Sequence, residues 1–97
     1  MASSFEGLDG AAAAQFETLR RQFVIGLPRR QHEIEAAPDA TALHGALHRL
    51  AGAAGSYGYT ALGQMARTAL RAMKAGKPAD LAASLRRLQQ EMDVLRS

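Results

Sequence analysis

Residues 38–58 read PDATALHGALHRLAGAAGSYG, and this stretch decides the fold. Asp39, after the break at Pro38, is a suitable N-cap because its carboxylate can accept the unpaired N–H groups of a following helical turn. Apolar side chains then recur every three or four residues, which predicts a helix over about 40–55 with one inward stripe. That stripe consists of Leu43, Ala46, Leu47, Leu50 and Ala54. Residues 55–58, Gly-Ser-Tyr-Gly, form the next break.

The same periodicity continues on both sides of this stretch. Upstream it predicts a helix over about 11–36, kinked or divided near Pro28 because proline removes one helical hydrogen bond. Downstream it predicts helices over about 59–75 and 79–96, separated by Gly76 and Pro78. The apolar positions in these three helices are Phe16, Leu19, Phe23, Leu27 and Ile34, then Leu62, Met65, Ala66, Ala69 and Met73, then Leu81, Leu85, Leu88, Met92 and Leu95.

Length and composition agree with a small helical domain. The chain has 97 residues, of which 47% are hydrophobic and only 5% aromatic, and alanine and leucine dominate the long segments rather than β-branched residues. Helices joined by connections of a few residues run antiparallel to their neighbours. The sequence therefore predicts an all-α, antiparallel up-down four-helix bundle over residues 11–97, preceded by a flexible lead-in over residues 1–10.

Composition also excludes several classes of function. The chain has no cysteine, so a disulfide scaffold, a thiolate zinc site and a cysteine nucleophile are ruled out. No apolar run approaches the length of a membrane span, and residues 1–6 lack the basic and apolar regions of a secretory signal, so we expect a cytoplasmic protein without membrane insertion. A net charge of +3 favours an acidic partner without naming one.

A second stripe on the helix over 40–55 carries the candidate chemistry. At 100° per residue, it comprises His44, His48, Ala51, Gly52 and Gly55, and it points away from the apolar stripe. A glycine within a helix costs about 0.5–1 kcal/mol relative to alanine, so Gly52 and Gly55 are expected to serve the close approach of a neighbouring helix or of an outside partner. An exposed histidine one turn before Gly52 is a nucleophile that a partner can approach without meeting neighbouring side chains.

Residues 48–58, HRLAGAAGSYG, resemble the signature of histidine-containing phosphotransfer (HPt) domains. His48 is followed by an apolar residue two positions on, by Gly52 four on and by Gly58 ten on, and the wider layout of helices is similar over residues 11–96. The resemblance implies an up-down bundle that relays phosphoryl groups without being an independent enzyme. It also implies that His48 is the phosphoacceptor and that the remaining residues of the stripe, together with Gly58, support it or contact the partner.

The resemblance further implies the partners. These are response-regulator receiver domains and a hybrid histidine kinase, and His48 would take a phosphoryl group from one receiver aspartate and pass it to another. Such transfer needs little from the protein beyond in-line positioning and neutralisation of charge. The receiver would supply Mg²⁺, so no cofactor or metal is expected in this chain, and a monomer is expected.

Two positions depart from the family pattern. Many members carry a lysine three residues after the histidine, where this chain has Ala51, and a glutamine or glutamate on the next helix, where it has Leu70. Arg49, Arg67 and Arg71 are candidate substitute cations.

These departures leave a second interpretation open, a non-catalytic docking or inhibitory module that binds a receiver or a histidine kinase. Metal binding by His44 and His48 lacks an evident third ligand. Nucleic-acid binding is not expected, because the arginine pairs lie on separate helices and Tyr57 and Tyr59 only flank a turn.

Overall fold

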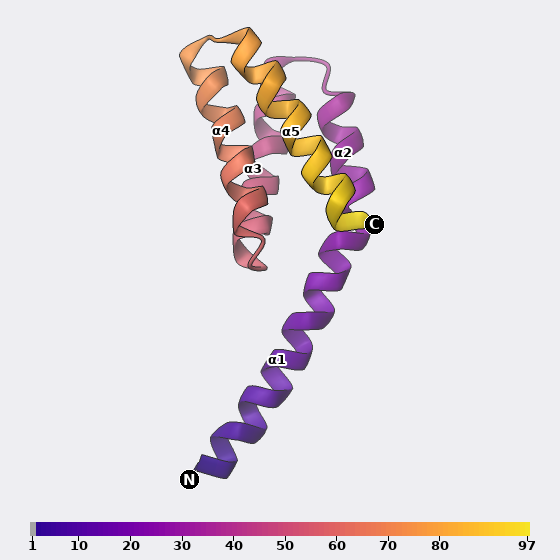
Figure 1. Ribbon diagram of the computed structural model, residues 1–97, viewed down its shortest axis with the longest axis vertical. Helices are drawn as coiled ribbons and strands as arrows, with labels where there is room; N and C mark the ends of the chain where they lie inside the picture. The colour runs from indigo at the N-terminus through magenta and orange to yellow at the C-terminus, as the bar shows by residue number, and fades with distance from the viewer. Residues whose placement is uncertain (1) are drawn as a thin grey trace.

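The computed structural model describes the backbone of residues 2–97 and the side chains of residues 10–97. This part of the chain is built from five helices and contains no strand. The helices are α1 (Ala2–Ile25), α2 (Leu27–Glu35), α3 (Ala40–Ser56), α4 (Thr60–Ala75) and α5 (Pro78–Arg96), shown in Figure 1. None of these helices is both long and apolar enough to span a membrane.

Helices α2 to α5 form the predicted four-helix bundle. Figure 1 shows α4 on one side of α3 and α5, and α2 on the other side, and α2 contacts both α3 and α5. The fully buried large side chains are Leu27, Leu47, Leu50, Leu62, Leu88 and Met92, so every helix of the bundle contributes at least one. The all-α bundle predicted from periodicity is confirmed.

Local signals set the ends of the helices, and the predicted bounds lie within one residue for the last three. The Asp39 carboxylate accepts a hydrogen bond of 2.8 Å from the Ala42 N–H, which caps α3. Gly76 ends α4 in the left-handed conformation with φ of 66°, where a side chain would be strained, and Pro78 begins α5.

The long first helical segment is divided at the place where the sequence predicts a break. Gly26 lies between α1 and α2, and Pro28 occupies the first turn of α2, where its missing N–H leaves no hydrogen bond unmade. The Gly26 N–H still donates to the carbonyls of Gln22 and Phe23, so the two helices follow each other closely.

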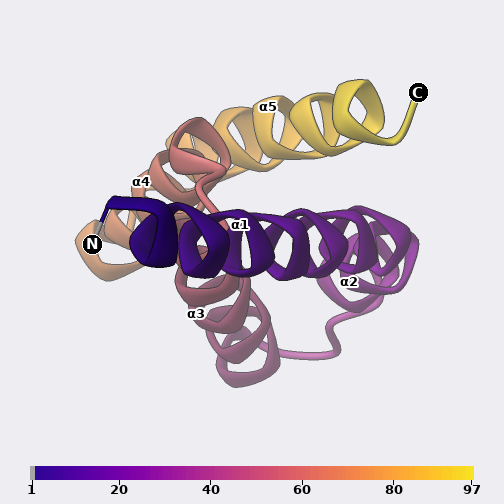
Figure 2. The ribbon, with the colours of Figure 1, turned by 90° about the horizontal axis from the view of Figure 1, so that it is seen from below.

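Helix α1 leaves the bundle. Figures 1 and 2 show its first half running beyond the ends of α3 and α4, and the molecule measures 55 × 24 × 21 Å along its principal axes. Phe23 is buried, whereas Phe16 and Leu19, which continue its apolar stripe, are 40% and 44% exposed, and the Phe16 ring still lies 6.4 Å from the Tyr57 ring between centroids. Of the expected lead-in, Met1 lies outside the described residues, and the backbone over 2–10 belongs to α1. The flexibility of that segment stays a prediction.

Gln31 connects α2 to α5 and is the one buried polar residue among those described. Its side-chain amide donates 2.8 Å to the Asp93 carboxylate, and its side-chain oxygen accepts 2.6 Å from Arg96. Gln89 donates 3.2 Å to the Gln31 backbone carbonyl. This network holds the C-terminal end of α5 against α2.

Candidate functional site

His48 lies at the middle of α3 and its side chain is exposed, whereas its neighbours Leu47 and Leu50 are fully buried. The helix therefore holds the imidazole on a firmly packed backbone and presents it to solvent. His44, one turn earlier, is also exposed, and the two rings lie parallel with 6.2 Å between their centroids. The predicted facing of both histidines is confirmed.

The backbone beyond His48 is uncovered. A Cβ atom built on Gly52 would meet no atom within 4 Å, so the glycine serves no contact within the chain. Gly52 was expected to serve the close approach either of a neighbouring helix or of an outside partner. The open space excludes the neighbouring helix and leaves the outside partner. Gly58 is also open, and its φ of 80° ends the turn after α3 in a conformation that favours glycine.

The exposed stripe is narrower than the sequence predicts. Ala51 was expected beside His48 on the outer surface, but it is buried, with 5% exposure. The reason is the close approach of α4, where Gly63 has no side chain. A Cβ on Gly63 would lie 3.5 Å from the Ala51 carbonyl oxygen and 3.6 Å from the Gly55 nitrogen. The Cβ atom of a lysine at position 51 would therefore lie under α4 rather than on the exposed face that carries His48.

Sequence reasoning missed Gly63. Its signal was a glycine within a helix, the same signal that drew attention to Gly52, and only the packing separates the two roles. Gly63 lets two helices of the bundle approach, and Gly52 leaves the surface open.

The three candidate cations have different surroundings. Arg49 pairs with Glu33 of α2 at 3.6 Å, so it is directed to the α2 side of α3. Arg67, on α4, reaches across to α3, and its Nη2 atom would lie 3.7 Å from a Cβ on Gly55. Arg71 donates 3.0 Å to the hydroxyl of Thr68 on its own helix. Of the three, Arg67 is the one that the structure brings beside Gly55, on the stripe that carries His48 and Gly52.

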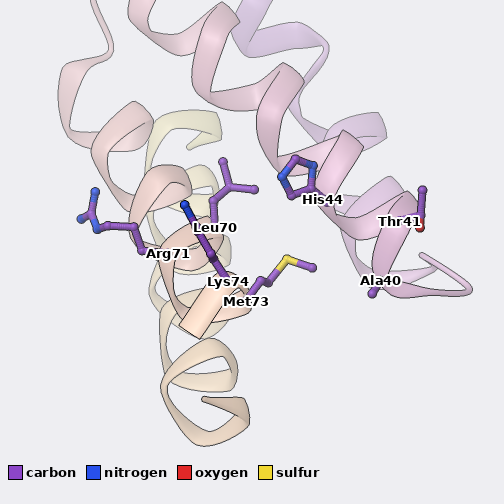
Figure 3. A pocket seen from close by; sticks show the side chains of 7 residues that line it. All are labelled: Ala40, Thr41, His44, Leu70, Arg71, Met73 and Lys74. Carbon is purple, nitrogen blue, oxygen red and sulfur yellow. The ribbon is translucent and has the colours of Figure 1, made fainter. Parts of the chain in front are cut away.

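A shallow groove of about 590 Å³ lies between α3 and α4 beside His44. Figure 3 shows His44 and Met73 directed toward each other's helix across it, with Lys74 running alongside Leu70 and Arg71 pointing away. The groove is completed by Ala40 and Thr41 at the start of α3. Its walls are mostly apolar, and Lys74, which the sequence analysis did not select, adds a cation one turn beyond Leu70.

Tyr57 and Tyr59 pack within the protein rather than forming a stacking platform. The Tyr59 ring stacks on Phe23 with 5.2 Å between centroids, and the Arg20 guanidinium carbon lies 4.6 Å from the centroid of the Tyr59 ring as a cation–π contact. Tyr57 lies 5.7 Å from Phe23. Among the residues with described positions, no three histidine, aspartate or glutamate side chains come together as a metal site would require.

Comparison with known proteins agrees with this geometry. The family model for the Hpt domain matches residues 10–97, which covers α2 to α5 and most of α1. Searches of the curated proteins and of the solved structures each gave no significant match. Hpt domains are phosphotransfer modules of phosphorelays rather than independent enzymes, and they interact in general with receiver domains and kinases. The chain, a helical bundle that matches this model over nearly its whole length, belongs to the Hpt domain family.

Proposed function

We propose that His48 is the phosphoacceptor of this Hpt domain. The observation that carries the proposal is an exposed imidazole on a helix whose opposite side is buried in the core. One turn after it comes a glycine with open space around it. A neutral imidazole has a nitrogen lone pair that can attack phosphorus. His44 shares the exposure but lies one turn further from Gly52, so it is the weaker candidate.

The reaction proposed is transfer from an aspartyl phosphate of a receiver domain. The lone pair of a His48 ring nitrogen attacks the phosphorus in line, an N–P bond forms, and the acyl phosphate O–P bond breaks with its electron pair returning to the aspartate carboxylate. The imidazole keeps one ring N–H, and the reverse reaction passes the phosphoryl group to a second receiver aspartate. Mg²⁺ at the receiver would neutralise charge on the transferring oxygens.

The surface around His48 supports docking of a protein that brings its own active-site loops. Gly52 leaves space for backbone to approach, and Gly58 leaves more space at the end of α3. Arg67 at the Gly55 end of the face, and Lys74 and Arg71 at the other end, provide positive charge for the acidic site of a receiver. Exposure of His48 favours transfer over the alternative, a module that only docks or inhibits.

The test is transfer of labelled phosphate from a phosphorylated receiver to this chain. We expect the wild-type chain and His44→Gln to accept an acid-labile label, and His48→Gln to accept none. His44→Gln is a matched control because it removes another exposed histidine from the same face of α3. Label on His48→Gln equal to that on the wild type would overturn the assignment. Receiver binding by the wild type without any label would favour the docking module instead.

A further inference from the structure

Two hollows between α4 and α5 join into one surface groove, here called the α4–α5 groove. Their volumes are about 410 and 260 Å³, and both are lined by Thr68, Ser84 and Arg87. All the lining residues belong to α4, to α5 or to the connection between them, and Figure 1 shows these two helices as antiparallel neighbours. None of the lining residues comes from α3, so the groove is a different surface from the one that carries His48.

The α4–α5 groove is positively charged. The charged side chains that line it are three cations and one carboxylate, those of Arg71, Lys77, Arg87 and Asp80. None of the ion pairs in the described part of the chain involves these cations. Figure 3 shows Arg71 pointing away from the groove between α3 and α4, and its guanidinium donates 3.0 Å to the Thr68 hydroxyl. Three cations around one groove that holds a single carboxylate favour an anionic occupant.

The length and the hydroxyls of the groove favour a polypeptide over a small phosphate compound. Its α4 wall runs from Ala61 to Ala75, about 21 Å along the helix axis, which is the length of about six residues of extended chain. The hydroxyls of Thr68 and Ser84 both donate to backbone carbonyls one turn earlier in their own helices. They can therefore only accept further hydrogen bonds, which peptide N–H groups donate and ionised phosphate oxygens do not.

The two ends of the groove differ in polarity. Lys77 lies at one end, and the other end is lined on α4 by the uncharged residues Ala61, Gln64 and Met65. Met65 is partly buried and packs against the core, so its exposed part offers an apolar surface in a fixed position. An occupant that fits both ends carries carboxylates along most of its length and an apolar side chain at one end.

We propose that the α4–α5 groove docks an extended acidic segment of a partner protein, with carboxylates beside the three cations and one apolar side chain beside Met65. This goes beyond phosphotransfer at His48, and it leaves α3 accessible to a receiver. A segment joined to a receiver would raise the concentration of that receiver near His48.

The test is the binding of a dye-labelled synthetic peptide to the full chain, measured by fluorescence anisotropy. The peptide is a run of glutamates with a leucine at one end. We expect Arg87→Glu to weaken binding about tenfold. Arg86→Glu is the matched control, because it makes the same change at the next residue of α5, about 100° round the helix from the groove, and should bind like the wild type. Both arginines are exposed, so neither variant disturbs the core.

Absence of peptide binding, or equal weakening by the two variants, would overturn the proposal. Equal weakening would mean that the peptide responds only to the net positive charge of the chain. Tighter binding of a single-stranded oligonucleotide or of pyrophosphate than of the peptide would also overturn it, because the occupant would then belong to another chemical class.

A second measurement locates the bound peptide. It should move the backbone amide NMR signals of Thr68 and Ser84 more than that of Gly52, and the opposite order would place the peptide on α3 and refute the proposal. His48→Gln should bind the peptide like the wild type. Loss of phosphotransfer and loss of peptide binding are therefore distinguishable outcomes.

Discussion

The imidazole rings of His44 and His48 lie parallel on the exposed face of α3, with 6.2 Å between their centroids and 8° between their planes. A phosphoryl group on His48 would add negative charge within one helical turn of His44. We therefore expect phosphorylation to move the ring signals of His44 in a histidine-resolved NMR spectrum. His32, on α2, is the internal control and should move less. Unchanged His44 signals in the phosphorylated protein would contradict the acceptor assignment.

Gly52 and Gly63 should respond oppositely to the same substitution. Gly52→Leu adds a side chain to open surface, so the free energy of unfolding should change little while phosphotransfer falls at least tenfold. Gly63→Leu pushes α3 and α4 apart and should destabilise the fold by about 1–3 kcal/mol. Urea unfolding and a transfer assay on both variants check this. Phosphotransfer to Gly52→Leu at the wild-type rate would show that the receiver does not need the open space at position 52 to reach His48.

Leu47 is fully buried and Leu85 is half-buried, so the same substitution should cost different amounts of stability at the two positions. Leu47→Ala leaves a cavity in the core and should cost about 2–5 kcal/mol of unfolding free energy. Leu85 lies in the apolar stripe of α5 but keeps partial solvent contact, so Leu85→Ala should cost less. Equal losses in chemical denaturation would mean that α5 faces the core differently.

The Gln31 network should contribute measurably to stability. Gln31→Ala removes the hydrogen bonds to Asp93 and Arg96, and we expect a loss of about 1–3 kcal/mol. Gln90→Ala, at an exposed position of α5, is the control and should change the free energy of unfolding by less than about 0.5 kcal/mol. An unchanged free energy of unfolding for Gln31→Ala would show that hydrogen bonds to solvent fully replace those to Asp93 and Arg96.

The N-cap of α3 can be tested without touching the site. Asp39→Ala removes the acceptor of the Ala42 N–H and should lower the free energy of unfolding by about 0.5–2 kcal/mol. Asp39→Asn keeps an acceptor oxygen and should recover most of that loss. Similar destabilisation by both substitutions in thermal unfolding would attribute the effect to charge rather than to the cap.

The bounds of the bundle helices could be predicted because their signals act within one or two turns. Asp39 caps α3 through a residue three positions away, and Gly76 ends α4 through its own backbone angles. The buried stripe of α3 followed from the 3.6-residue period, and so did the exposure of His48. Periodicity was less informative at the edge of the stripe, where it placed Ala51 on the open face.

The sequence by itself determined the bounds of α3, α4 and α5, the break near Pro28 and the face of α3 that carries His48, because each depends on residues close together in the chain. It did not determine the start of α1, which begins at Ala2 rather than near residue 11. Only the tertiary structure decided that α4 covers Ala51, that Glu33 of α2 draws Arg49 aside and that Arg67 reaches the Gly55 end of α3. It also decided that α1 passes beyond the bundle and leaves Phe16 and Leu19 exposed. These outcomes depend on how closely helices distant in sequence approach each other, and side-chain volumes such as the missing one at Gly63 set that distance.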